Sequence, residues 1–188
     1  MKKINLLIGL AIGFCLLSGI SLSACGKAIL RSFEGKVVDA ETKEPIEGAA
    51  VLAVYYESTI SVAGSGSYAV DAQETLTDAN GEFKIPAQTA KIKDASGKLQ
   101  CNLIIFKPGY GVFPRHTLSN AVGENKSWPP PEKYIVYEIP RLKTIEERKN
   151  NVIGMDSYMK PLYIRAIDEE RKNLGLELIT MSEEEIWE

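Results

Sequence analysis

The spacing of apolar residues changes along the chain, from strand-like in the first two thirds to helix-like near the C-terminus. Residues 33–37 alternate apolar or small side chains with charged ones, whereas residues 49–56 (AAVLAVYY) and 100–106 (QCNLIIF) are mostly apolar. Alternation predicts a half-buried strand, and a short apolar run between turn residues predicts a strand covered on both faces. Residues 134–139 (YIVYEI) predict a last strand. We therefore predict a mainly β fold in which residues 49–56 form a central strand.

An Asp-x-Asn-Gly turn lies at the centre of this pattern, within residues 75–86. Asn80 and Gly81 tolerate positive φ at low cost, and the Asp78 side chain can accept a hydrogen bond from the backbone two residues later. The turn therefore predicts a β-hairpin, whose first strand begins near Tyr68. A calcium loop is the alternative, but the glycine comes two positions early and the closing carboxylate is missing. The residues favour the turn.

Three segments between the predicted strands are rich in small or polar residues and predict loops: 58–66, 87–98 and 114–131. The last of these contains Trp128 followed by three prolines, which favour an extended conformation that cannot join a central ladder. An exposed Trp128 would be a contact point for a sugar ring or a partner protein. The alternative is that Trp128 covers the edge of a sheet.

Charge density rises after Pro140, and the apolar period lengthens to nearly four residues. Thr144 and Glu147 have the spacing of a capping box, which predicts a short helix. A second helix is predicted over about 157–173, and Gly175 is placed to end it. Its apolar stripe consists of Met159, Tyr163 and Ile167. The two helices either fold back on the strands or form an arm that docks a partner.

The first 24 residues predict a signal peptide. Two lysines precede an apolar run over residues 4–20, and Leu22-Ser23-Ala24-Cys25 resembles a bacterial lipobox. This resemblance implies cleavage before Cys25, a lipid of the palmitate class on Cys25, and a lipoprotein anchored to the membrane. Gly26 after the cysteine favours the cell outer membrane, on its periplasmic or surface face. An ordinary secretory signal or a membrane helix is the alternative. Residues 25–32 would then be the acylated cysteine and a tether, whose seven residues after Cys25 span at most about 25 Å.

Processing changes the charge and the cysteine count. Removal of residues 1–24 takes away two of the 22 basic side chains and no acid, so 20 face 25 acidic ones and the net charge moves from −3 to near −5. An acidic chain is a poor partner for nucleic acid. Cys15 leaves with the signal peptide and Cys25 carries lipid, so no intramolecular disulfide is expected. The remaining Cys101 is expected to be a small buried apolar group rather than a reactive thiol.

Four short motifs follow one another in a recognisable order. They are Gly35-Lys-Val-Val-Asp39, Pro45-Ile46-x-Gly48-Ala49-x-Val51, Thr77-Asp78-x-x-Gly81-x-Phe83 and Phe106-Lys107-Pro108-Gly109-Tyr110. Together they resemble the carboxypeptidase regulatory-like domain over roughly residues 33–112. The resemblance implies a small transthyretin-like (prealbumin-like) antiparallel β-sandwich, which we place at residues 33–140, with a helical extension over 141–188. Short strands separated by turn clusters favour a sandwich independently of the family.

The residues argue against an enzyme. His116 is the only histidine, so a two-histidine metal site is excluded by count. A Gly-x-Ser-x-Gly nucleophile elbow in a strand-to-helix context is missing as well. His116 therefore reads as a surface loop residue, and we predict no catalytic residues, no cofactor and no metal. The family resemblance implies the same, because such domains accompany catalysis rather than perform it.

Two functions remain open. The first is a lipid-anchored, non-catalytic module for binding or assembly, which holds another envelope protein. The second is a carbohydrate-binding module at the cell surface, with polysaccharide contacts from the aromatic side chains of Trp128, Tyr110 and Phe113. Aligned exposed aromatics would favour the sugar, and an apolar patch would favour a protein.

Overall fold

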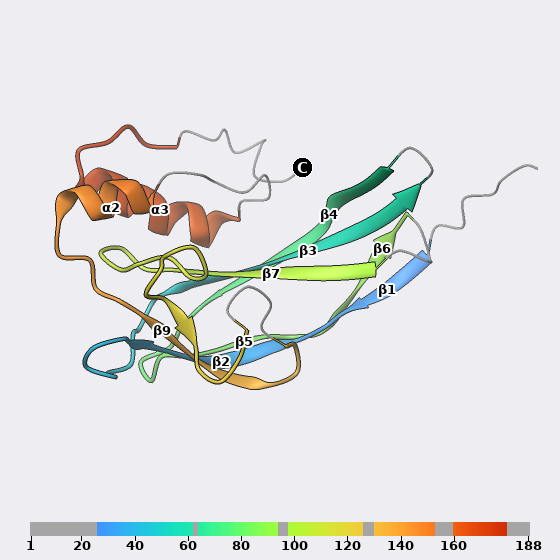
Figure 1. Cartoon of the computed structure of the whole chain (residues 1–188), viewed down its shortest axis with the longest axis horizontal. Helices are drawn as coiled ribbons and strands as arrows, with labels where there is room; N and C mark the ends of the chain where they lie inside the picture. The colour runs from blue at the N-terminus through green and yellow to red at the C-terminus, as the bar shows by residue number, and fades with distance from the viewer. Residues whose placement is uncertain (1–25, 62–63, 94–97, 126–129, 153–159, 180–188) are drawn as a thin grey trace, which may run out of the picture.

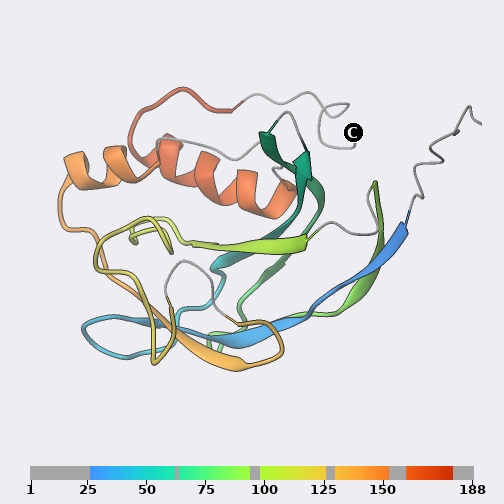
Figure 2. The same ribbon diagram turned by 45° about the vertical axis from the view of Figure 1, so that its right-hand side comes forward.

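The protein is a β-sandwich of a four-stranded and a three-stranded sheet, with a separate two-stranded ribbon and a helical layer on the outer face of the three-stranded sheet (Figures 1 and 2). A computed structural model describes residues 26–61, 64–93, 98–125, 130–152 and 160–179. The predicted fold class, a mainly β sandwich with a C-terminal helical extension, is confirmed. Cys25, Trp128 and Met159 lie outside the described residues.

The first sheet has the strand order β5-β2-β9-β8. Its strands are β2 (Phe33–Asp39), β5 (Glu82–Ile85), β8 (Asn120–Ala121) and β9 (Tyr134–Ile139). The predicted strands at 33–37 and 134–139 are confirmed. The sequence predicted an antiparallel sandwich. The pairing of β2 with β9 is parallel, however, so this sheet is mixed. The chain reaches β9 from β8, which pairs with β9 antiparallel in the same sheet, whereas β2 lies far away in sequence and can therefore pair with β9 in parallel.

The second sheet has the order β4-β3-β7, with β3 (Ala50–Ser61) between β4 (Gly64–Leu76) and β7 (Lys98–Phe106). The prediction that residues 49–56 form a central strand covered on both faces is confirmed. Alternate residues of β3 belong to two different cores: Val51, Ala53 and Tyr55 lie between the sheets, and Ala50, Leu52 and Val54 lie on the helical side. Such two-sided burial explains why this stretch lacks polar positions.

The turn at Asp78–Gly81 is confirmed, but the predicted hairpin is wrong, because β4 and β5 belong to different sheets. Asp78 Oδ1 accepts hydrogen bonds from the amides of Asn80 and Glu82, each at 2.8 Å, and Gly81 has φ of +75°. Just before the turn, Thr77 is buried and its Oγ1 donates to Ile46 O at 2.6 Å. Thr77 therefore holds the chain where it crosses from one sheet to the other.

Two predicted loops are strands. Residues 58–61 and 64–66 extend the paired strands β3 and β4, whose pairing continues to Ser61 and Gly64. Residues 88–92 form β6 (Gln88–Ile92), which pairs antiparallel with β1 (Gly26–Leu30). The predicted tether over 26–32 is therefore largely a strand, and the β1–β6 ribbon runs beyond the end of the first sheet (Figure 1). The mixed composition of residues 26–32 does not predict a strand, because the pairing partner of β1 is a distant segment that the local sequence pattern does not reveal.

The helical layer consists of α2 (Ile145–Asn151) and α3 (Pro161–Asn173). The capping box at Thr144 and Glu147 is confirmed, and Gly175 ends α3 with φ of +66°. The structure begins α3 at Pro161, later than predicted. The amides of Leu162 and Tyr163 donate to the two carboxylate oxygens of Glu74 on β4, each at 2.9 Å, and so cap the helix from another element.

The face of α3 that carries Tyr163 and Ile167 packs on the outer side of the second sheet, and Tyr163 meets Phe106 edge-on with ring centroids 6.1 Å apart. Of the two arrangements that the sequence left open, the helices therefore fold back on the strands. This packing buries Tyr163 and Ile167, the described members of the apolar stripe that a docking arm would have offered to a partner.

Candidate binding cleft

A cleft of about 600 Å³ is lined by residues of β1 and β7. Figure 2 shows the β1–β6 ribbon departing from the sandwich. The walls of the cleft come from consecutive residues of two strands, Lys27–Arg31 on β1 and its end, and Leu99–Cys101 on β7. Phe33, Tyr55, Ile92, Pro130 and Pro131 complete the lining. A volume of this size is typical of ligand-binding pockets.

Tyr55 and Cys101 lie across from each other on paired strands at the inner end of the cleft. The Tyr55 hydroxyl donates to Arg31 O at 2.8 Å, which fixes the ring against the end of β1. Burial raises the pKa of Tyr55 far above its usual range and raises the pKa of the Cys101 thiol to about 12. Both groups are therefore neutral near pH 7. Cys101 packs against the core but is only partly buried, whereas the sequence predicted a buried side chain.

The charged side chains among the described residues that line the cleft are Lys27 and Arg31, both cations. Arg31 approaches Glu132 at 3.9 Å, but both side chains are more than half exposed, so this ion pair contributes little. Lys27 lies directly opposite Lys91 on β6. Like charges at facing positions of a ribbon repel each other, and a bound anion would relieve that repulsion.

The two strand edges that face the cleft are open within the described part of the chain. In these residues β1 pairs with β6 on one side only, and β7 pairs with β3 on one side only. The other edge of β7 makes a single isolated bridge, between Ile105 and Phe113 at its far end. The chain that leads into β9 passes the end of β1, where the Glu132 amide donates to Ser32 O at 3.0 Å. Prolines 130 and 131 just before this point have no amide hydrogen to extend the ladder along β1.

The aromatic residues proposed as a contact surface do not form one. Phe113 is fully buried and packs edge-on against Tyr137, with ring centroids 5.0 Å apart, so its assignment as an exposed contact is wrong. The sequence showed the residue in an irregular stretch, and only the bridge from Phe113 to Ile105 turns its ring inward. Trp128 lies outside the described residues.

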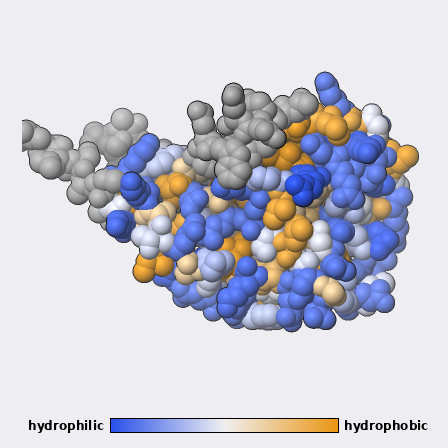
Figure 3. Space-filling model, turned by 180° about the vertical axis from the view of Figure 1, so that it is seen from behind, coloured by the Kyte–Doolittle hydropathy of each residue, from blue (hydrophilic) through white to orange (hydrophobic). Residues whose placement is uncertain are grey.

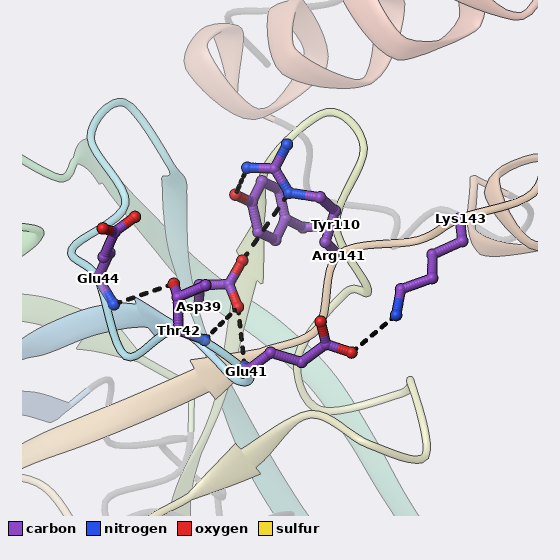
Figure 4. A network of polar contacts seen from close by, with 7 residues as sticks. All are labelled: Asp39, Glu41, Thr42, Glu44, Tyr110, Arg141 and Lys143. Atoms are coloured by element: carbon purple, nitrogen blue, oxygen red, sulfur yellow. Dashed lines mark hydrogen bonds and ion pairs between the residues drawn. The ribbon is translucent and has the colours of Figure 1, made fainter.

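Tyr110 belongs to a polar network that joins the 39–44 turn to the segment after β9 (Figure 4). The Arg141 guanidinium lies 5.0 Å from the centroid of the Tyr110 ring, and its Nη2 donates to the Tyr110 hydroxyl at 2.6 Å. Arg141 Nε also lies 3.9 Å from Asp39 Oδ2, whose other oxygen accepts the amides of Glu41 and Thr42. The Tyr110 ring thus has a structural partner and lies apart from the cleft lining.

His116 lines a smaller hollow of about 270 Å³ together with Glu147 and Asn151. Its Nδ1 accepts a hydrogen bond from the Leu118 amide at 3.3 Å, and its ring lies so close to Gly111 that a Cβ there would come within 2.6 Å. Hydrogen bonds from the backbone and side chain of Thr144 lower the pKa of the Glu147 carboxyl. These contacts hold the 111–119 loop and the capping box in place.

Within the described ranges no cluster of three or more histidine, cysteine, aspartate or glutamate side chains is placed to hold a metal ion. In the same ranges, every helix is too short or too polar to cross a bilayer. On the face seen in Figure 3, hydrophilic side chains divide the apolar surface into separate strips.

No known protein family, curated protein or solved structure matches this chain. The resemblance to the carboxypeptidase regulatory-like domain and to a lipobox therefore stays a prediction. Sequence reasoning missed the cleft because residues 26–32 were assigned to a tether. The alternation of the apolar residues Ala28 and Leu30 with charged neighbours was the available signal for a strand. The apolar Ile29, which lies at an exposed position between them, obscured it.

Proposed function

We propose that the protein is a lipid-anchored lipoprotein of the cell envelope, which acts as a non-catalytic binding or assembly module for another envelope protein. The cleft between β1 and β7 is the observation that carries this proposal. It offers apolar side chains, two cations and open strand edges. The Tyr55 hydroxyl and the Cys101 thiol stay protonated and therefore uncharged.

The carbohydrate alternative depended on aligned, exposed aromatic side chains. Phe113 is buried and Tyr110 is engaged by Arg141, so two of its three contact residues are occupied by structural roles. A protein partner suits the cleft better, because a lining of mixed apolar and polar groups with two cations matches the composition of protein interfaces more closely than a sugar platform.

The placement of the cleft suits a membrane-anchored protein. Lys27 lies two residues after Cys25, so a lipid on that cysteine would hold the cleft next to the bilayer surface. Two or three acyl chains anchor a protein stably, because each buried methylene contributes about 0.8 kcal/mol.

The anchor is tested by feeding cells a radioactive palmitate and comparing the full-length wild type with Cys25→Ala. We expect label and membrane association for the wild type, and loss of both in the variant. A wild-type chain that carries no acyl group would overturn the anchored part of the proposal.

The binding part is tested by site-specific photo-crosslinking in intact cells. A benzophenone side chain replaces Leu99, which lines the cleft, or Leu118, which is 68% exposed elsewhere. We expect one defined envelope protein, identified by mass spectrometry, to be linked at position 99 and not at position 118. Equal, heterogeneous products at both positions would show that the cleft has no dedicated partner.

A further inference from the structure

The backbone groups that face the cleft from β1 can be identified from the pairing register. The Val37 amide donates to Gly81 O, so the odd-numbered residues of β2 direct their N–H and C=O groups toward β5. Residues 31 and 32 belong to no strand, but Phe33 pairs with Ile85 and Leu30 with Gln88, so the pairing offset is the same on both sides of the break and the same alternation applies to β1 and β6. In an antiparallel pair alternate residues point to opposite edges. Gly26, Ala28 and Leu30 therefore direct their backbone groups toward the open edge.

This edge has the position that β9 occupies beside β2. Within the described residues the β9 ladder does not continue along β1: the Glu132 amide donates to Ser32 O, and Pro130 and Pro131 before it have no amide hydrogen. Among the described residues, no strand therefore lies between β1 and the open edge of β7. Edge strands in folded proteins are ordinarily covered, twisted away or interrupted, because they recruit other strands.

The surroundings of this position set the composition of its occupant. On the inner side an added strand would meet Tyr55, Leu99 and Cys101, which favour apolar side chains. On the outer side it would lie beside Lys27, Arg31 and the exposed Ile29, which favour carboxylates with some apolar contact. Successive side chains of a strand alternate between the two sides.

We propose that the cleft binds its protein partner by strand addition, and that the bound segment is extended, with alternating apolar and acidic residues, and pairs with the edge of β1. Main-chain hydrogen bonds to Ala28 and its neighbours supply affinity in this mode of recognition, and the alternate side chains supply specificity. This inference rests on the proposed function and names the chemistry of its partner.

The test uses the full-length chain in detergent and a defined probe, the peptide Glu-Val-Glu-Val-Glu-Val-Glu. Two readouts are followed: amide hydrogen exchange at Ala28 and Leu30, and alkylation of Cys101 by iodoacetamide, read by mass spectrometry. We expect the peptide to slow both. The Lys-Val counterpart should bind at least about tenfold more weakly, because it places cations beside Lys27 and Arg31.

Two substitution pairs separate backbone pairing from simple occupation of the cleft. Ala28→Pro removes the outward amide without removing a β1–β6 hydrogen bond, whereas Ala28→Ser keeps it. We expect roughly tenfold weaker peptide binding for the proline variant and little change for the serine variant. Arg31→Glu should weaken binding similarly, while Arg165→Glu, on the exposed face of α3, should not.

Three results would overturn strand addition. They are no effect of the peptide on either readout, protection of Cys101 with unchanged exchange at Ala28 and Leu30, and equal binding by the Ala28→Pro and Ala28→Ser variants. Stronger protection of Cys101 by palmitate than by the peptide would assign the cleft to an acyl chain. If crosslinking at position 99 still captures a defined partner in these cases, the proposed function stands and only the mode of binding fails.

Discussion

Single residues in the cleft owe their chemistry to the packing around them. Tyr55 and Cys101 carry groups that titrate readily in water, yet both lie against the core and their charged forms are disfavoured by burial. The packing of Cys101 against apolar side chains was predictable from its apolar neighbours in sequence. The role of Tyr55, which ties β3 to Arg31, was not, because the two residues meet only through the tertiary fold.

The reactivity of Cys101 provides a prediction at this scale. Because its pKa is raised to about 12, the thiolate is rare at pH 8, and its alkylation by iodoacetamide should accelerate about tenfold per pH unit up to roughly pH 11. In the unfolded chain the rate should instead level off above about pH 9, near the ordinary pKa of a cysteine. Mass spectrometry of the peptide containing Cys101 measures both rates. A native rate that levels off at the same pH as the unfolded one would contradict the assignment.

The same shift has a consequence for stability. Folding favours the protonated thiol of Cys101. Its contribution to the free energy of unfolding is therefore complete below about pH 8.5, the pKa in the unfolded chain, and is lost as the pH rises toward 12.

At the level of elements, local sequence fixed turns and helix ends more firmly than strand partners. The Asp78–Gly81 turn, the Thr144 capping box and the end of α3 at Gly175 are all found as predicted. The turn nevertheless joins two sheets, because the partner of β5 is β2. A turn defines the direction in which the chain leaves it, but the pairing of the strands depends on distant residues.

Gly81 allows a prediction about this turn. A Cβ at Gly81 would lie 2.4 Å from Val37 O, and φ is +75°, whereas Gly109 has a similar φ of +82° with nothing within 4 Å of a Cβ. Gly81→Ala should therefore lower the free energy of unfolding by about 3 kcal/mol, and Gly109→Ala by about 1 kcal/mol. Urea denaturation measures both. Equal losses would mean that the close approach to Val37 is relieved without cost.

Across the whole molecule, β3 connects two cores. One lies between the sheets and the other lies under α3, so the helical layer is part of the folding unit. Glu170 strengthens this layer: it is fully buried, and Arg148 on α2 donates to its carboxylate through Nε at 2.8 Å and Nη2 at 2.6 Å. Asn151 adds a further link, because its side chain donates to Tyr110 O and accepts from the Val112 amide.

Removal of the buried carboxylate should therefore destabilise the entire protein. Glu170→Ala leaves the Arg148 cation without its partner and should lower the free energy of unfolding by about 3 kcal/mol. The neighbouring Glu169→Ala, at an exposed position, should change it by less than about 0.5 kcal/mol. Far-ultraviolet and near-ultraviolet circular dichroism should report one common transition for both variants. Release of the helical signal before the sheet signal in Glu170→Ala would show that the layer unfolds independently.

The sequence by itself determined the mainly β class, the central strand at residues 49–56, the turn at Asp78–Gly81, the capped start of α2 and the end of α3, because each depends on apolar period or on hydrogen bonds between near neighbours. The tertiary structure alone decided that β2 pairs in parallel with β9, that β1 and β6 form a ribbon, and that Phe113 points inward. The cleft between β1 and β7 belongs to the second group. Its walls are strand edges from residues about 70 positions apart, and their separation depends on how the two sheets diverge rather than on any local pattern.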